Sequence, residues 1–134
     1  LSESTSNDGN FHNLNKNMKK EISQQFASSE KFLNESVLNE FSFCKTYKGW
    51  IPSRFKDVAN KKFSFINIDV DLYEPTLKTL EFFYPRLVKG GIIIFDDYNF
   101  EIWEGVQKAW DDFFKNKEYS FFYENPTGGC FLIK

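Results

Sequence analysis

Four aspartates at two places in the sequence have the residue type and spacing of a cation site. Asp69 and Asp71 follow one apolar run, and Asp96 and Asp97 follow the next. Carboxylates packed this closely repel one another unless they are protonated or share a cation. Because the set contains oxygen donors only, with no Cys or His, it favours Mg²⁺, Mn²⁺ or Ca²⁺.

Two buried strands must position these carboxylates. The runs 63–68 and 92–95 are apolar and of strand length, which is typical of parallel strands covered on both faces. In open α/β sheets, ligands bind at the rim formed by the carboxyl ends of such strands. The sequence therefore predicts that both acidic groups meet at one rim, with Asp69 and Asp71 on the same face if the first strand continues to Tyr73.

The same aspartates also have a structural interpretation. Aspartate at the end of a strand often caps the following helix or supports a turn. Asp71 could support the turn before Pro75, and Asp97 could start the loop 98–100. Any one aspartate taken alone favours this structural role, whereas two acidic groups on neighbouring parallel strands favour a ligand or metal site.

The remaining pattern predicts strands that alternate with helices, and hence a mostly parallel sheet with helical cover and an antiparallel hairpin at its edge. Pro75 suits the first turn of a helix, Pro85 kinks or ends that helix, and Gly90-Gly91 closes it. The other predicted segments are a polar loop or flexible arm (1–20), a helix in one or two pieces (20–39), a strand (41–47), a turn (48–50), a short helix or loop (51–62), a helix (about 102–116) and two hairpin strands (119–124 and 129–134).

Composition excludes several classes of protein. The 134 residues are 41% hydrophobic and 19% aromatic, which predicts one domain with a packed core. A net charge of −2 favours neither nucleic acid nor a membrane as a partner, and no apolar stretch approaches the roughly 20 residues of a membrane span. We expect a cytoplasmic location, because no signal peptide opens the sequence. The sequence starts at Leu1 and not at Met, which indicates a fragment or a processed piece.

The cysteines and the single histidine do not suggest further chemistry. Cys44 and Cys130 both fall in predicted strands, so we expect two buried thiols in a reducing compartment. His12 lies in a polar stretch, and one histidine argues against a structural zinc site and a serine-hydrolase triad. The tryptophans are expected to pack in the core or at the rim, although the first two could line a pocket: Trp50, Trp103 and Trp110.

The strings around the acidic groups resemble a known family. They are IDVDLYEPT at 68–76, LEFFYPRLVKGGIIIFDDY at 80–98 and GVQKAWDDF at 105–113. Together they are similar to the macrocin O-methyltransferases (TylF/MycF-like), which are class I enzymes that use S-adenosylmethionine and Mg²⁺ to methylate sugars and other small molecules. The similarity covers about 26–134. It implies a Rossmann-like three-layer sandwich with a mostly parallel sheet and a C-terminal antiparallel hairpin.

The resemblance also implies roles for the acidic residues. Asp69, Asp96 and Asp97 match the positions that hold the metal, which would bind two oxygens of the acceptor and lower the pKa of its hydroxyl. Asp69 is also the candidate catalytic residue that takes the proton. Asp71 is either a further ligand or a support for the loop, and Tyr98 is expected beside the acceptor.

One part of the family pattern is absent from the sequence. No glycine-rich G-x-G-x-x-G loop follows a predicted first strand, so no cofactor-binding residue is assigned. The resemblance then implies that the first two strands are missing and that residues 21–134 are the C-terminal part of a methyltransferase domain.

Two hypotheses about function follow. The chain is part of a Mg²⁺-dependent O-methyltransferase that acts on a hydroxyl of a sugar or another small molecule. Alternatively, it is a non-catalytic remnant that binds a cation or forms a homo-oligomer through its uncovered sheet edge, but cannot bind S-adenosylmethionine. For these residues in isolation we expect little or no catalysis.

Overall fold

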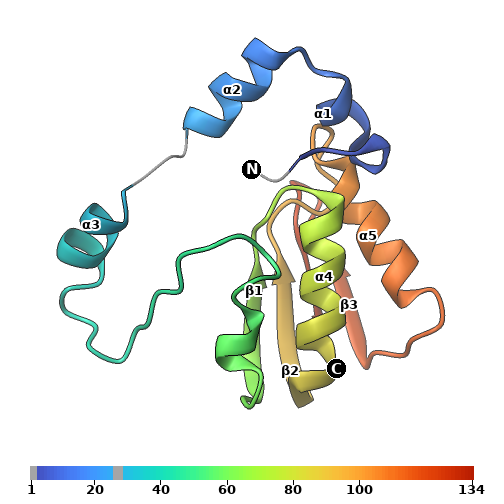
Figure 1. The fold of residues 1–134 in the computed structure, drawn as a ribbon. Helices are drawn as coiled ribbons and strands as arrows, with labels where there is room; N and C mark the ends of the chain where they lie inside the picture. The colour runs from blue at the N-terminus through green and yellow to red at the C-terminus, as the bar shows by residue number, and fades with distance from the viewer. Residues whose placement is uncertain (1–2, 26–28) are drawn as a thin grey trace.

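The computed structural model describes residues 3–25 and 29–134, and its centre is a four-stranded sheet of order β1-β2-β4-β3 (Figure 1). Strand β1 (Phe63–Ile68) runs parallel to β2 (Leu87–Phe95). Strand β4 (Cys130–Ile133) is antiparallel both to β2 and to β3 (Phe121–Glu124). The α/β class, the parallel pair and the terminal hairpin are confirmed. The described sheet is mixed, however, and not mostly parallel.

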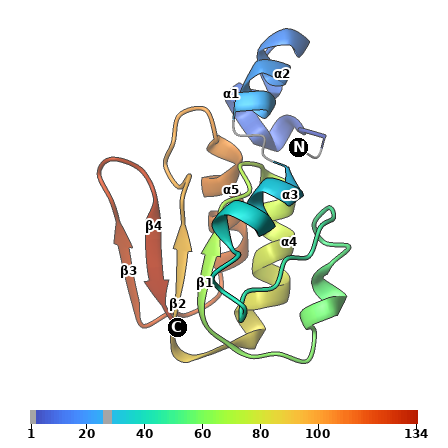
Figure 2. The same cartoon turned by 90° about the vertical axis from the view of Figure 1, so that its left-hand side faces the viewer.

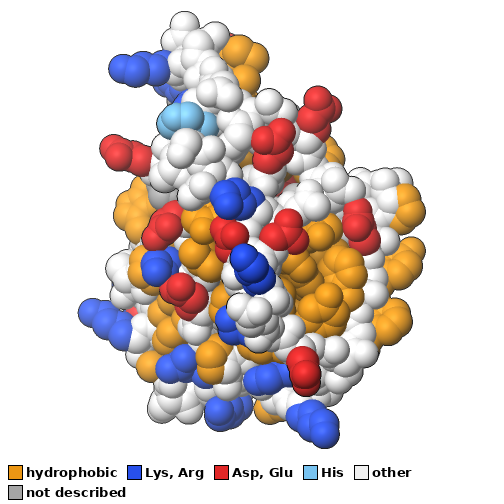
Figure 3. All heavy atoms as spheres, turned by 90° about the vertical axis from the view of Figure 1, so that its right-hand side faces the viewer, with side chains coloured by type: hydrophobic (Ala, Val, Ile, Leu, Met, Phe, Trp, Pro, Cys, Tyr) orange, Lys and Arg blue, Asp and Glu red, His pale blue; other side chains and the backbone are white. Residues whose placement is uncertain are grey.

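Two helices cover one face of this sheet and form the core with it. Helix α4 (Tyr73–Phe83) connects β1 to β2, α5 (Glu104–Phe114) connects β2 to β3, and the two helices pack against each other. Alternate residues of the strands face them and are buried: Ile66, Ile68, Ile93, Phe95, Cys130 and Leu132. On the outside, the helices carry charged side chains of both signs (Figure 3).

The opposite face of the sheet is largely uncovered (Figure 2). Phe65 of β1 is 56% exposed, although its neighbour Ile66 is only 8% exposed. Phe121 and Tyr123 of β3 are also exposed on their strand. Within the described residues, this apolar face therefore has no helical layer comparable with α4 and α5.

The N-terminal segment is more helical than its composition suggested. Residues 1–20 were expected to form a loop or flexible arm, but a 3-10 turn at Ser6–Asp8 leads into α1 (Gly9–Asn13) and α2 (Lys16–Gln25). A capping box between Thr5 and Asp8 stabilises the first turn. This local device needs no apolar periodicity, and so the polar composition concealed it.

The predicted helix over 20–39 is present in two pieces, because α2 is followed by α3 (Glu30–Phe32) and a π-helical turn at Leu33–Val37. Residues 26–28 of that prediction lie outside the described residues. Of the described helices, none has both the length and the apolar character needed to cross a membrane.

The strand predicted at 41–47 is wrong. These residues form turns and irregular, exposed chain, and Cys44 is therefore an exposed thiol, whereas Cys130 is buried in β4 as expected. An apolar run becomes a strand only when a neighbouring strand pairs with it, and no described strand does so. The short helix expected within 51–62 is a 3-10 turn at Phe55–Val58.

The role predicted for Gly90-Gly91 is also wrong. Helix α4 ends at Phe83, and the 3-10 turn Tyr84–Arg86, which includes Pro85, leads directly into β2. Both glycines lie inside β2, where the pairing register with β1 shifts. Gly90 has a φ of +77° there, a conformation that costs glycine little and other residues more.

Candidate metal centre and adjoining pockets

The carboxyl ends of β1 and β2 bring three carboxylates together. The parallel register pairs Ile68 with Phe95, so Asp69 and Asp96 follow at the same level of the sheet. The Asp96 N–H donates to the Ile68 carbonyl over 3.1 Å and fixes the two strand ends to each other. One oxygen each from Asp69, Asp96 and Asp97 lie within 4.8 Å of one another. These residues thus meet as expected; that they bind a metal stays a prediction.

The carboxylates form one wall of a pocket of about 470 Å³. Asp71 joins the three on this wall, so the pocket holds all four of the aspartates singled out in the sequence. Apolar side chains from α2 and from the loop before α5 complete it: Ile22, Phe100, Ile102 and Trp103. We call this the acidic pocket.

Burial and mutual repulsion disfavour full ionisation of the acidic pocket. Asp69 and Asp96 are exposed at the pocket wall and Asp97 is half-buried. Partial desolvation raises the pKa of Asp69, and the nearby Asp96 raises it further. Burial, followed by the charge of Asp71, raises the pKa of Asp97 to about 7. A divalent cation would oppose these shifts because it stabilises the ionised form of each carboxylate. The oxygen-only donor set therefore fits a hard divalent cation such as Mg²⁺.

Asp71 reaches this pocket through a backbone turn and not through the strand. Its φ is +62°, and the N–H of Leu72 donates to the carbonyl of Val70 over 2.6 Å. This is the positive-φ form of the γ-turn, which is rare and strained for a residue with a side chain. The turn places the Asp71 carboxylate beside Asp97, which donates a hydrogen bond to it when protonated. The strand does not continue to Tyr73, where α4 begins, so the condition for Asp69 and Asp71 to share a strand face is not met.

Tyr98, which was expected beside the acceptor, lies in the core. Its side chain is 6% exposed and packs edge-on against Trp110 and Phe122. Burial raises its pKa to about 12. The neighbouring Phe100 and Ile102 line the acidic pocket instead. Sequence reasoning missed both, although their place directly after the acidic pair was the available signal.

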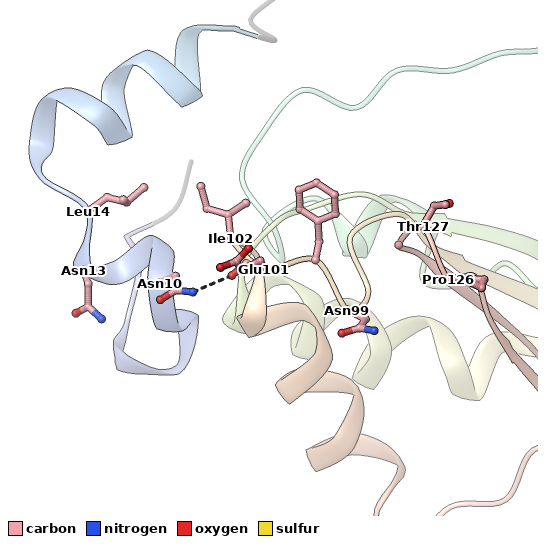
Figure 4. A pocket seen from close by; sticks show the side chains of 10 residues that line it. Asn10, Asn13, Leu14, Asn99, Glu101, Ile102, Pro126 and Thr127 are labelled. Atoms are coloured by element: carbon pink, nitrogen blue, oxygen red, sulfur yellow. Dashed lines mark hydrogen bonds between the residues drawn. The ribbon is translucent and has the colours of Figure 1, made fainter.

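A larger pocket of about 910 Å³ adjoins the acidic pocket and shares Phe100 and Ile102 with it (Figure 4). We call it the amide pocket, because Asn10, Asn13 and Asn99 contribute carboxamides to its walls. Its other walls come from α1, the loop before α5 and the turn between β3 and β4: Leu14, Glu101, Pro126, Thr127 and Gly128.

Hydrogen bonds tie the walls of the amide pocket together. The side-chain amide of Asn10 donates to the Glu101 carbonyl over 3.1 Å and to the Glu104 carboxylate over 2.9 Å. The amide of Asn99 donates to the carboxylate of Glu124 in β3. None of the described residues that line either pocket is Lys or Arg.

Known proteins share parts of this sequence and fold. The family model described as macrocin-O-methyltransferase (TylF) matches residues 3–120. A curated relative from Streptomyces olivaceus, 8-demethyl-8-(2,3-dimethoxy-alpha-L-rhamnosyl)-tetracenomycin-C 4'-O-methyltransferase, is 40% identical over 50 residues, which cover 37% of this chain and 19% of the relative.

Two solved structures are similar to the chain. The O-methyltransferase NovP aligns with a TM-score of 0.69 and 19% identity over 99% of this chain and 53% of its own. CalS11, a TDP-rhamnose 3'-O-methyltransferase of calicheamicin biosynthesis, aligns with a TM-score of 0.49 and 26% identity over 62% of this chain and 36% of its own. The chain thus spans about half or less of the length of these proteins.

The similarity to solved structures concerns the fold, whereas the match to the family model concerns the sequence. The likeness to NovP, at 19% identity, concerns the fold alone. The family model covers most of the sequence, including both acidic groups and the helices between and after them. This chain therefore belongs to the macrocin O-methyltransferase (TylF) family.

Proposed function

We propose that this chain forms the metal- and acceptor-binding part of an O-methyltransferase that uses S-adenosylmethionine and Mg²⁺ and methylates a sugar hydroxyl. The observation that carries the proposal is the meeting of Asp69, Asp96 and Asp97 at one rim, in a chain whose family transfers methyl groups to oxygen. The curated relative is named for methylation of a rhamnosyl 4' position, which supports a sugar as the acceptor.

The carboxylates have separate tasks in this proposal. Asp69, Asp96 and Asp97 would hold the cation, which would supply Lewis-acid activation of the acceptor hydroxyl. Asp69 would then accept the hydroxyl proton, because its carboxylate lines the pocket in which the acceptor would lie. Asp71 would place a fourth carboxylate beside Asp97. Protonated Asp97 donates a hydrogen bond to Asp71, and that bond is lost when Asp97 ionises to bind the cation.

The acceptor would extend over both pockets. Its reacting sugar ring would lie in the acidic pocket, against Phe100 and Ile102, and the rest of the molecule in the amide pocket beyond them. The absence of Lys and Arg from the described lining residues favours an uncharged glycoside over a sugar nucleotide, because a diphosphate is normally held by cationic side chains.

The methyl donor would be held by residues that this sequence does not contain, since it has no glycine-rich loop of the dinucleotide-binding type. The coverage of 53% of NovP agrees with a partial domain. The alternative is a non-catalytic remnant that keeps the cation site. Both versions share the metal centre, and so that centre is the first thing to test.

Titration of the chain with Mn²⁺, followed by electron paramagnetic resonance, tests the metal centre directly. We expect one tight site that is lost when Asp96→Ala and Asp97→Ala are combined. Asp111→Asn is the matched control, because Asp111 is an exposed carboxylate on α5 outside the pocket. Equal Mn²⁺ affinity in the double variant and the unmodified chain would exclude the proposed metal role.

A further inference from the structure

Asp8 has a buried carboxylate that the proposed chemistry does not use. It is 2% exposed, and burial of a carboxylate is costly unless its charge is compensated. One oxygen accepts the N–H of Tyr73 over 2.6 Å, and the other accepts the N–H and hydroxyl of Thr5 over 2.5 and 3.2 Å. Among the described residues, no Lys, Arg or His forms an ion pair with it.

The Tyr73 N–H that Asp8 accepts is the first N–H of α4. The first N–H groups of a helix have no partner within the helix and are usually capped by a polar side chain just before it. Leu72 stands at that position and cannot provide a cap. Asp8 supplies the missing acceptor from a segment distant in sequence, and its negative charge suits the positive end of the helix dipole.

The capped residue directly follows the strained turn that carries Asp71. A residue with φ of +62° remains in that conformation only when its surroundings fix both ends of the turn. On the strand side, the bond from the Asp96 N–H to Ile68 fixes the chain. On the helix side, the bond from Tyr73 to Asp8 does so.

Helix α5 leaves Asp8 little room to move away. A Cβ atom at Gly105 would lie 2.5 Å from the Asp8 oxygen and 2.8 Å from the Tyr73 nitrogen. The carboxylate and the start of α4 are therefore packed directly against the backbone of α5. Such close packing makes the bond between Asp8 and Tyr73 a rigid contact.

We propose that Asp8 is a positioning residue of the metal centre. Its carboxylate holds the N–H of Tyr73 and thereby the strained turn that directs Asp71 to Asp97. Asp8 contacts no ligand itself and acts through Asp71. The inference rests on the proposed metal site, and the experiments below separate the failure of one from the failure of the other.

The first experiment compares the Mn²⁺ dissociation constants of three variants with that of the unmodified chain. Asp8→Ala should raise the constant about tenfold, as the loss of an outer support of a metal site commonly does. Asp8→Asn should raise it less, because an amide oxygen can still accept the Tyr73 N–H. Thr5→Val is the matched control: it removes the hydroxyl bond to Asp8 but leaves the bond to Tyr73. It should lower stability without changing the constant.

A double-variant cycle then tests whether Asp8 acts through Asp71. Asp8→Ala should weaken Mn²⁺ binding in the unmodified chain and have no further effect in Asp71→Ala, because the side chain that Asp8 positions is then absent. Hydrogen exchange provides a readout without metal: the amides of Leu72 and Tyr73 should exchange faster in Asp8→Ala than in Thr5→Val.

Three results would overturn the proposal. The Mn²⁺ dissociation constant could be unchanged in Asp8→Ala, or Asp8→Ala could weaken Mn²⁺ binding equally with and without the Asp71 side chain. The third is equal amide exchange in Asp8→Ala and Thr5→Val. If Asp8→Ala does not fold, Asp8→Asn and Thr5→Val decide, and equal constants in those two overturn it. A failure of the unmodified chain to bind Mn²⁺ would instead refute the proposed function and remove the basis of this inference.

Discussion

Asp97 is the carboxyl of the acidic pocket whose protonation changes near neutral pH. Its pKa is raised to about 7 by burial first and by Asp71 second, so near neutral pH it is partly protonated. The pKa of Asp71 is raised too, again chiefly by burial. Metal binding and protonation therefore compete for the same oxygens.

This competition predicts how the stability of the metal-free chain changes with pH. A carboxyl whose pKa is raised by folding binds its proton more tightly in the folded state, so it stabilises the fold at low pH. That contribution declines as the pH rises toward about 7. In the presence of a chelator, the melting temperature should fall by several degrees between about pH 5 and about pH 8, and Mg²⁺ should restore it at the higher pH.

Asp97→Asn is the comparison that isolates this effect, because the amide does not titrate. Its melting temperature should change less over the same pH range, and Mg²⁺ should stabilise it less. Thermal unfolding followed by circular dichroism measures both. Identical pH profiles for the variant and the unmodified chain would show that Asp97 does not have the raised pKa.

At the scale of elements, strand β2 combines a regular carboxyl end, which carries the acidic pair, with an irregular start. Gly90 has positive φ and open space around its α-carbon, whereas a Cβ at Gly91 would lie 2.6 Å from the Leu87 side chain and 2.9 Å from the Val88 carbonyl. The two neighbouring glycines are therefore required for different reasons, one conformational and one steric.

Alanine at each position should separate these reasons. Gly90→Ala should lower the free energy of unfolding by about 1 kcal/mol through backbone strain alone. Gly91→Ala should lower it more, because a backbone carbonyl must shift to admit the new methyl group. Urea denaturation measures both values. A neutral Gly90→Ala variant would contradict the positive φ at this position.

The elements also show where sequence reasoning succeeded. Apolar runs and helical periodicity located β1, β2, α4, α5 and the terminal hairpin, because these elements form the core and their patterns reflect burial on one face. The rim rule located the three carboxylates that meet. Helix α1 and the start of α2 were missed because a capping box, and not apolar spacing, begins the N-terminal segment.

The unpredicted parts of the site depend on contacts between distant residues. The turn at Asp71 needs the Tyr73 N–H to be held by Asp8, and no local pattern encodes that bond. Tyr98 lies in the core because Trp110 and Phe122 surround it. The prediction of a strand at 41–47 was wrong because a strand forms only when a second strand pairs with it, and one segment's sequence does not show whether such a partner exists.

At the scale of the whole molecule, apolar surface remains uncovered. Phe65 on the open face of the sheet is 56% exposed, and Phe43 and Trp50, in the irregular chain before β1, are 80% and 65% exposed. Exposed apolar side chains in such numbers commonly mark an interaction surface. In NovP, about half of the chain lies outside the part that aligns with this one.

This surface predicts the behaviour of the 134 residues in isolation. They should self-associate at micromolar concentration in sedimentation velocity, and Phe65→Lys should reduce the association, because it places a charge on the open face. Met18→Lys is the matched control, because Met18 lies on α2, away from the sheet face, and is 45% exposed. Monomeric behaviour of the unmodified chain would contradict an interaction surface here.

Calorimetry with S-adenosylmethionine tests whether this chain alone can bind the methyl donor. The chain alone should show no micromolar binding, because it lacks a glycine-rich loop for the donor. Micromolar binding would refute both the partial-domain proposal and the non-catalytic alternative.

The bond between Asp8 and Tyr73 also sets an order of events during folding. The unit β1–α4–β2 is local in sequence and can close early, whereas Asp8 and Tyr73 are 65 positions apart. The strand ends, with Asp69 and Asp96, would thus come together before the N-terminal segment docks. During refolding in the presence of Mn²⁺, the ion should first bind weakly and then bind more tightly. The time between the two stages would report when the N-terminal segment docks.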